Sequence, residues 1–353
     1  MHGMTPPQDD TKRSAVESAD NDSADVAEIE ARRWRDIERR LARIERQCEG
    51  IAGIVSAAPY AVLHKKFRPR LWSPQQYSSR RLRTPARYAL ERAPADAPSI
   101  AIVTPSLNQG DFIAATIDSV LQQSYPHLAY LVQDGGSRDD TPAVLRRYRE
   151  KLTWRSQPDS GQAQAINRGF AAITGDIMGY LNSDDTLLPG TLAYVAKAFQ
   201  AHPEVDVVYG HRIYLDEGGF EIGRCVLPAH DVEALKWADY VPQETLFWRR
   251  RVWDKVGPFD ETFQFALDWD FILRAQAAGF RFMRLPRFVA CFRVHDLQKT
   301  SDRMNVGTAE MQRLRTRSLG ETPGVYEIRR GIAAYIFRHM MVDWGYRLGL
   351  LRY

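Results

Sequence analysis

Residues 177–185 have the sequence IMGYLNSDD, and this stretch decides the fold class. It begins as a short apolar run typical of a buried strand and ends in an amide, a hydroxyl and the two carboxylates of Asp184 and Asp185. Adjacent carboxylates repel each other and lose hydration at high cost, so a strand tip either exposes them to water or supplies a cation. Two interpretations follow. One is a site where Mg²⁺ or Mn²⁺ meets a diphosphate, and the other is an acidic turn that caps the helix beginning near Pro189.

Three more runs rich in β-branched residues precede this stretch, and each is followed by helical periodicity. They are residues 99–104, 128–133 and 152–156. The alternation predicts βαβ units around a mostly parallel sheet flanked by helices, an α/β fold. All four strands end in polar turns, which carry Asn108, Asp134, Asp159 and Asp184. Because the carboxyl ends of parallel strands share one edge of a sheet, these side chains outline a cleft.

The composition predicts one large globular domain with appendages. The chain has 353 residues, of which 44% are hydrophobic, and a formal net charge of only +4. Its three widely spaced cysteines exclude a disulfide framework or a cysteine-based zinc site and fit a reducing compartment. The polar N-terminus does not have the pattern of a secretory signal, and the longest apolar run is too short to span a bilayer. We therefore expect a cytoplasmic location, with peripheral attachment to the inner face of the cytoplasmic membrane left open.

Three segments of different composition precede the first predicted strand. Residues 1–25 are polar and acidic, which predicts disorder. Residues 26–63 place apolar side chains at alternating steps of three and four, which predicts an amphipathic helix of coiled-coil character. That helix can pair in a homodimer or lie on another protein or a membrane. Residues 64–97 form a basic segment with interleaved aromatics, typical of a solvated linker or of contact with an anionic membrane, and no nucleic-acid motif accompanies it.

The C-terminal tail also has a helical pattern. From about residue 308 onward an apolar stripe is accompanied by arginines. The pattern predicts helices whose stripe docks on the domain, with a membrane surface as the alternative. The stripe consists of Ile332, Ile336, Phe337, Met340, Trp344, Leu348 and Leu351.

Six short motifs in order resemble the family 2 glycosyltransferases, which are inverting enzymes of GT-A fold that use nucleotide sugars. The motifs are Thr104-Pro105-Ser106 with Asn108, Asp134-Gly135-Gly136-Ser137 with Asp139, Asp159-Ser160-Gly161 running on to Asn167-Arg168-Gly169, Gly175-Asp176, Leu181-Asn182-Ser183-Asp184-Asp185, and Leu267-Asp268-Trp269-Asp270. The resemblance covers residues 98–300 and implies a nucleotide-binding half, 98–210, an acceptor half, 211–300, and separate C-terminal helices, 301–353.

The resemblance implies a nucleotide site at the ends of the first strands. Asp134 would receive the base, because the imide N–H of uracil or thymine needs an acceptor. The other residues implied to bind the nucleotide are Thr104, Pro105, Asn108, Asp159, Asn182 and Ser183.

The resemblance also implies a divalent metal. The family has an Asp-X-Asp element whose last carboxylate binds Mg²⁺ or Mn²⁺, and the ion neutralises the leaving nucleoside diphosphate. Asp184 matches that carboxylate, with Asp185 beside it, and His295 lies where some relatives place a histidine near the metal. The first acid of the element is replaced here by Asn182, which brings no charge.

An inverting transfer needs a general base that takes the proton of the acceptor hydroxyl. Asp268 matches the family's base, although the acid that usually precedes it is Leu267. This apolar neighbour should raise the pKa of Asp268 by desolvation. The same residue can also cap the helix, and Asp270 is the alternative base. The residues expected on the acceptor side are Gln243, Glu244 and Trp248.

The expected activity is transfer of a sugar from a UDP- or dTDP-sugar to a hydroxyl of a cell-surface glycan or lipid-linked acceptor. Two alternatives stay open. A nucleotidyltransferase would need a glycine-rich, basic loop after the first strand, where the chain has Pro105-Ser106-Leu107-Asn108. A non-catalytic binding or scaffold protein with a vestigial site would explain the departures at Asn182 and Leu267.

Overall fold

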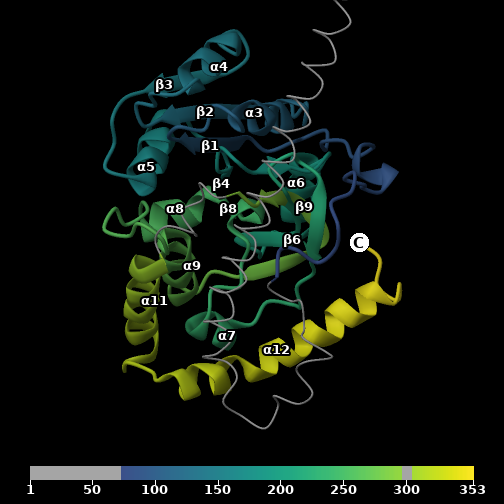
Figure 1. Cartoon of the computed structure of the whole chain (residues 1–353), viewed down its shortest axis with the longest axis vertical. Coiled ribbons are helices and arrows are strands. Elements are labelled where there is room, and N and C mark those ends of the chain that lie inside the picture. The colour runs from purple at the N-terminus through teal and green to yellow at the C-terminus, as the bar shows by residue number, and fades with distance from the viewer. Residues whose placement is uncertain (1–72, 296–303) are drawn as a thin grey trace, which may run out of the picture. The chain divides into compact units, whose positions relative to one another are not determined.

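One mixed sheet organises the chain, and the computed structural model describes residues 73–295 and 304–353 (Figure 1). The strand order is β3-β2-β1-β4-β8-β6-β9-β5, with β7 paired to β6. The first half consists of β1 (Ile100–Ser106), β2 (Leu128–Asp134), β3 (Thr153–Ser156) and β4 (Ile177–Tyr180). All pairings within this half are parallel, so its strands end at one edge, as the sequence pattern predicts.

The second half of the sheet is mixed and contains a hairpin that turns at Gly218-Gly219. Its strands are β5 (Thr186–Leu187), β6 (Val207–Leu215), β7 (Glu221–Cys225), β8 (Phe247–Arg249) and β9 (Phe282–Arg293). β6 and β9 are parallel, whereas β8 runs antiparallel to β4 and β6. The two-residue strand β5 follows Asp185 directly and pairs with Ala290 and Cys291 of β9. This pairing holds the end of the 177–185 stretch against the end of β9.

Helices cover both faces of the sheet, which confirms the predicted α/β class. One face packs against α3 (Ile113–Leu121), α4 (Thr141–Arg147) and α6 (Thr191–Ala201). The other packs against α5 (Gln162–Ala172), α7 (Val232–Trp237), α8 (Arg250–Val256) and α9 (Leu267–Ala277). The alternation along β1 explains the two layers, because Ile100 and Ile102 enter one core and Ala101 and Val103 enter the other. The sheet thus fixes the positions of the loops at its edge.

Residues 73–97, which belong to the predicted basic linker, are packed on the domain. The Gln76 amide donates to the Ile222 carbonyl at 2.8 Å, and Arg80 forms a β-bridge with Glu221. The short 3₁₀ helix η2 (Ala86–Tyr88) places Tyr88 in the interior, where the Phe288 amide donates to its hydroxyl at 3.1 Å. This part of the segment is therefore an extension of the domain rather than a solvated linker. The predicted disorder of 1–25 and the predicted helix at 26–63 lie outside the described residues.

The tail is helical, as expected, but its docked face differs from the prediction. It forms α11 (Met304–Leu319) and α12 (Val325–Arg347). The residues of α12 that are buried are Tyr335, His339 and Asp343, whereas Phe337, Trp344 and Leu348 of the predicted stripe are exposed. The prediction that the apolar stripe docks was wrong for these residues, because polar and aromatic side chains make the contact. Within the two described ranges, no helix is both long and apolar enough to cross a membrane.

Candidate active site

The turns after β1, β2 and β3 are tied together by side chains that the sequence singled out. Asn108 adopts a left-handed conformation with φ 53°, its amide donates to Ser137 Oγ at 2.7 Å, and its Oδ1 accepts from the Arg138 amide at 2.9 Å. Asp134 Oδ2 accepts from the Ser137 amide at 3.1 Å and from Ser156 Oγ at 2.5 Å. Asp134 therefore organises the edge at which the nucleotide is expected.

The other residues predicted for the base pocket differ in their surroundings. Thr104 is buried and its hydroxyl lies 3.1 Å from the hydroxyl of Tyr130, so its side chain faces the core rather than a ligand. Pro105 is also buried. The Asp159 carboxylate lies over Gly135, where an added Cβ would come within 2.7 Å of Oδ2. Of these residues, Asp159 and the glycine turn are the ones positioned at the rim.

Asn182, the departure from the family element, joins two other amides. Its Oδ1 accepts from Gln162 Nε2 at 2.6 Å, and its Nδ2 donates to Gln243 Oε1 at 2.9 Å. Gln243 Nε2 continues to the Tyr180 carbonyl at 2.9 Å, and Ser183 is buried at the same turn. An amide both donates and accepts, whereas a carboxylate only accepts, so an amide at 182 suits this network.

Asp184 and His295 meet at the end of β9. His295 Nε2 lies 3.0 Å from Asp184 Oδ2, and the His295 ring packs against Phe112 with 4.4 Å between ring centroids. A carboxylate oxygen and an imidazole nitrogen are both ligands of first-row divalent ions, so this pair fits a metal site open to substrate oxygens. In residues 73–295 and 304–353 no three His, Cys, Asp or Glu side chains form such a group, and Asp184 and His295 are the two candidate donors that the described residues bring together here.

Asp185, predicted as a metal ligand, has a different role. It is 1% exposed, and its Oδ1 accepts from the backbone amide of Arg293 at 3.0 Å. Burial, followed by the charge of Asp184, raises its pKa well above the usual range. The two adjacent carboxylates therefore have different contacts: Asp184 lies beside His295, and Asp185 accepts a hydrogen bond from the end of β9.

Asp268 lies in the first turn of α9. It is half-buried, and Oδ1 accepts from the Trp269 amide at 2.9 Å. Burial raises the pKa of this carboxyl to about 6. Such a value suits a general base that works near neutral pH, since the group is ionised there yet retains affinity for a proton.

Asp270 cannot serve as the alternative base, because two guanidinium groups hold its carboxylate. It is completely buried, with Oδ2 2.7 Å from Arg274 Nε and Oδ1 2.6 Å from Arg317 of α11. The prediction of a catalytic alternative at Asp270 is corrected accordingly. This residue joins α9 to α11.

Trp248, predicted on the acceptor side, is a core residue. It is 0% exposed on β8, between β4 and β6, and packs against Phe170, Phe259 and Phe271. A side chain at the centre of a sheet has no surface to offer an acceptor, so this prediction was wrong. Glu244 is also buried, within the 3₁₀ helix η3 (Gln243–Thr245).

Comparisons with known proteins identify the family of the chain. The glycosyl transferase family 2 model matches residues 101–264. A PGL/p-HBAD biosynthesis glycosyltransferase of Mycobacterium tuberculosis is 30% identical over 183 residues, which span 50% of this chain and 70% of the relative. The chain belongs to glycosyl transferase family 2. This membership makes it a glycosyltransferase, and neither the nucleotidyltransferase nor the non-catalytic alternative gains support.

One more sequence relative and one solved structure are also similar to this family 2 glycosyltransferase. The O-antigen biosynthesis protein RfbC of Myxococcus xanthus is 35% identical over 189 residues, 51% of this chain but 15% of that protein. The structure of S. aureus TarS 1-349 in complex with UDP-GlcNAc aligns with a TM-score of 0.53 at 18% identity, covering 69% of this chain and 73% of that one. The structural likeness confirms the GT-A fold that the sequence motifs implied.

The glycosyltransferase site contains charged residues that sequence reasoning missed. Arg212 of β6 holds Glu244 through two contacts of 2.7 and 2.6 Å. Asp239 keeps an exposed surface, yet desolvation of its carboxylate and then the charge of Asp268 raise its pKa well above the usual range. Burial, followed by the charges of Asp268, Asp239, Asp185 and Glu244, raises the pKa of the Tyr180 phenol well above its usual range. An arginine inside the apolar pattern of β6 was the available signal, whereas nothing local marks Asp239.

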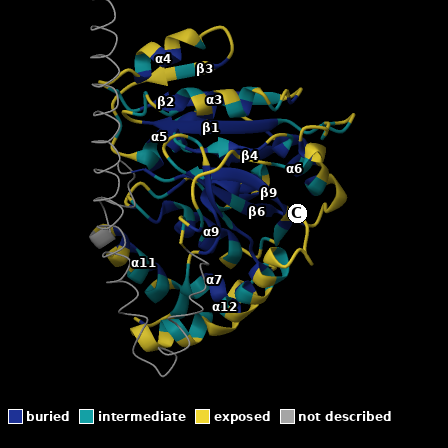
Figure 2. Cartoon of the chain, turned by 45° about the vertical axis from the view of Figure 1, so that its right-hand side comes forward, coloured by how far each residue is buried: buried dark blue, intermediate teal, exposed yellow. Residues whose placement is uncertain are grey.

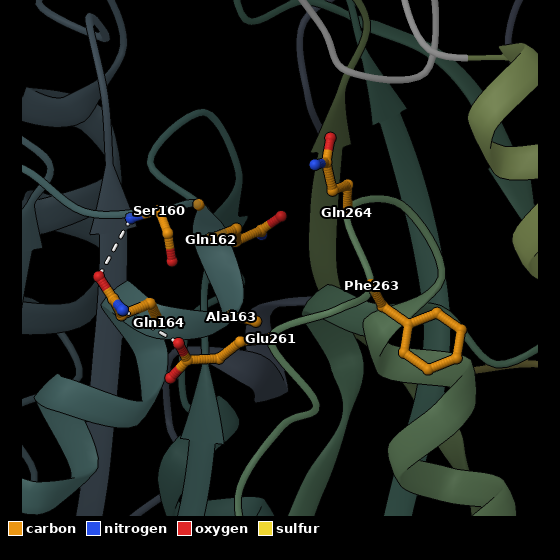
Figure 3. Close-up of a pocket in the computed structure, with 8 residues that line it drawn as sticks. Ser160, Gln162, Ala163, Gln164, Glu261, Phe263 and Gln264 are labelled. Carbon is orange, nitrogen blue, oxygen red and sulfur yellow. Dashed lines mark hydrogen bonds between the residues drawn. The ribbon is translucent and has the colours of Figure 1, made fainter.

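A small pocket beside the N-terminus of α5 shows how this helix is held in the glycosyltransferase (Figure 3). Gln164 Oε1 accepts from the Ser160 amide at 3.0 Å, and its Nε2 donates to Glu261 at 3.0 Å. Asn167 exchanges two bonds with the Phe259 backbone, at 2.9 and 3.0 Å. The Asn167-Arg168-Gly169 motif therefore couples α5 to the loop that leads into α9 and Asp268.

An Asp270→Asn substitution is expected to destabilise the enzyme without removing its base. Breaking a buried ion pair by neutralising one partner costs about 3 kcal/mol, because Arg274 and Arg317 lose their counter-charge. The urea midpoint should fall, while kcat per folded molecule should change by less than about threefold. A loss of kcat with unchanged stability would instead return the base role to Asp270.

Proposed function

We propose that this enzyme is an inverting transferase that moves a sugar from a UDP- or dTDP-sugar to a hydroxyl of a cell-surface glycan or lipid-linked acceptor. The observation that carries the proposal is the contrast between two carboxylates of α9. Asp270 is neutralised by two arginines, whereas Asp268 is partly exposed and its pKa is raised to about 6. The names of relatives from biosynthesis of O-antigen and PGL/p-HBAD support a cell-surface product.

In the proposed reaction, Asp268 removes one proton from the acceptor hydroxyl. The oxygen of that hydroxyl bonds to the anomeric carbon of the sugar on the face opposite the nucleotide, and the nucleoside diphosphate leaves with the electron pair of the broken bond. Asp184 and His295 would hold Mg²⁺ or Mn²⁺, which neutralises the charge of the diphosphate when bound. Arg212 keeps Glu244 paired, so that its charge adds less repulsion to the carboxylates nearby.

The hydrogen bonds of Asp134 support a pyrimidine imide as the group recognised. Its Oδ2 already accepts from the Gly136 amide, the Ser137 amide and Ser156 Oγ, whereas Oδ1 accepts, among the described residues, from Ser137 Oγ alone. A carboxylate oxygen has two lone pairs, so Oδ1 retains one for the imide N–H of uracil or thymine. The Asp134 side chain is 0% exposed, so the base reaches that lone pair only if the glycine turn, over which Asp159 lies, moves aside.

The donor is identified by measuring release of nucleoside diphosphate from a panel of UDP-, dTDP- and GDP-sugars by the purified enzyme with and without Mn²⁺, with nucleotide binding measured separately. Slow metal-dependent release from one UDP- or dTDP-sugar, absent in Asp184→Ala, is the expected result. Release from GDP-sugars alone would refute the proposed base recognition. If well-folded protein binds no nucleotide, the donor proposal as a whole fails.

The rate of transfer should fall as the pH drops below about 6. Asp268 must be ionised to accept a proton, and its pKa of about 6 lies above the ordinary aspartate value. kcat/KM should therefore lose about tenfold per pH unit below 6 and stay flat above it. The neighbouring groups Asp239, Glu244 and Arg212 act on the same carboxyl. An acid limb that persists unchanged in Asp268→Asn would assign the titration to another group.

A further inference from the structure

Within residues 73–295 and 304–353, no side chain covers one apolar face of helix α12. Of the fourteen large hydrophobic side chains that are exposed in the described ranges, eight lie between Val325 and Leu351. Phe337, Met341, Trp344 and Leu348 are exposed by 63%, 50%, 48% and 75% and follow one another at steps of four, three and four residues. This spacing puts them on one side of the helix, which Figure 2 shows as an exposed edge.

The opposite side of α12 is fixed to the domain. The Tyr335 ring stacks on Tyr240 with 4.2 Å between centroids, and His339 is 1% exposed. Asp343 is buried, and Arg347, its ion-pair partner on the same helix, donates from Nη2 to Gln76 Oε1 at 3.1 Å. These contacts set the rotation of the helix, so the apolar face points outward as a consequence of the fold.

Arginines border this face. Arg330, Arg338, Arg347 and Arg352 are exposed. Arg338 pairs with Asp231 and Arg347 with Asp343, and Arg330 and Arg352 have no carboxylate partner in the ranges that the structure describes. A second copy would bring the same positive charges together, whereas anionic lipid headgroups would attract them. Tryptophan and tyrosine also favour the membrane–water boundary, where Trp344 and Tyr326 would lie.

We propose that α12 binds an anionic phospholipid surface, with Phe337, Met341, Trp344 and Leu348 immersed among the lipids and the arginines at the headgroups. On the opposite side of α12, Tyr335 stacks on Tyr240, which follows Asp239 in the sequence. The inference does not depend on which donor or acceptor the enzyme uses.

Vesicle flotation of the full-length chain tests this proposal. The vesicles are phosphatidylcholine alone or phosphatidylcholine with phosphatidylglycerol, and the variants are Phe337→Ser/Leu348→Ser and Arg330→Glu/Arg352→Glu. Wild type should float with the anionic vesicles, and the apolar variant should lose about 100-fold in partition coefficient, because two large side chains no longer enter the lipid. The charge variant should lose binding to anionic vesicles only. Phe220→Ser, an exposed aromatic on the β6–β7 hairpin, is the matched control and should bind as wild type.

Two outcomes would overturn the proposal. Equal flotation of the Phe337→Ser/Leu348→Ser variant and wild type would assign membrane binding to another segment or to none. A concentration-dependent dimer in sedimentation that the same variant abolishes would make the face an interface between copies. The urea midpoint of each variant, which these surface substitutions should leave unchanged, shows that the chain is folded and keeps the test independent of the proposed function.

Discussion

An Asp268→Asn variant should lose about 10³-fold in kcat for transfer while binding the nucleotide as the wild type does. The amide keeps the shape of the side chain and can still accept from the Trp269 amide, but it cannot take a proton. The measurement is steady-state transfer to acceptor, with nucleotide affinity measured by titration calorimetry. An unchanged kcat would show that another group is the base.

The stability of the Asp268→Asn variant distinguishes loss of the base from unfolding of the protein. Burial raises the pKa of the Asp268 carboxyl to about 6, so the folded protein holds its proton more tightly than the unfolded chain does. Ionisation therefore destabilises the fold as the pH rises from about 4 to 6, and the neutral amide removes that penalty. Asp268→Asn should be at least as stable as wild type at pH 7. Asp270→Asn, the same change two residues along α9, is the matched control, with the opposite signature of low stability and retained turnover.

An Asp184→Ala variant should abolish the Mn²⁺ dependence of donor hydrolysis and lower its rate by about 10²- to 10³-fold. The expected size reflects the several kcal/mol that a divalent ion contributes to charge neutralisation. Removal of this carboxylate also leaves His295 without its partner at 3.0 Å. Mn²⁺ binding in the presence of UDP, followed by electron paramagnetic resonance, measures the site directly.

His295→Ala is the companion variant, because it removes the second donor and keeps the carboxylate. It should weaken Mn²⁺ binding by roughly 10- to 100-fold, and Phe220→Ser should leave Mn²⁺ binding unchanged. If Asp184→Ala retains wild-type Mn²⁺ affinity, the ion is held elsewhere and the pairing of Asp184 with His295 is structural.

The sequence predicted the architecture because the apolar periodicity is local. β1, β2 and β4 begin within one residue of their predicted positions, and the cleft follows from their parallel direction. The roles of individual acids depend on partners far along the chain. Arg317, which forms an ion pair with Asp270, belongs to α11. The backbone amide of Arg293, which donates a hydrogen bond to Asp185, belongs to β9. No pattern around either aspartate indicates those contacts.

The role of Trp248 also depends on contacts with residues far along the chain. An aromatic residue after the Gln243-Glu244 pair is compatible with a sugar-stacking surface or with a core strand. The distinction depends on the pairing of β8 between β4 and β6, which is a long-range property of the sheet. Asp239 was missed for a related reason, since its importance comes from lying near Asp268 and not from any motif.

The short pairing of β5 with β9 has a consequence for how the enzyme folds. It joins Asp184 to His295 across 111 residues of sequence, a contact that forms only after the intervening strands have found their places. Contacts of such long sequence separation are slow to form because the loop entropy must be lost first. During synthesis, a chain released as far as residue 210 would already carry Asp184 and the turns proposed to bind the nucleotide, but not His295. The proposed metal site should therefore be completed after the proposed nucleotide site.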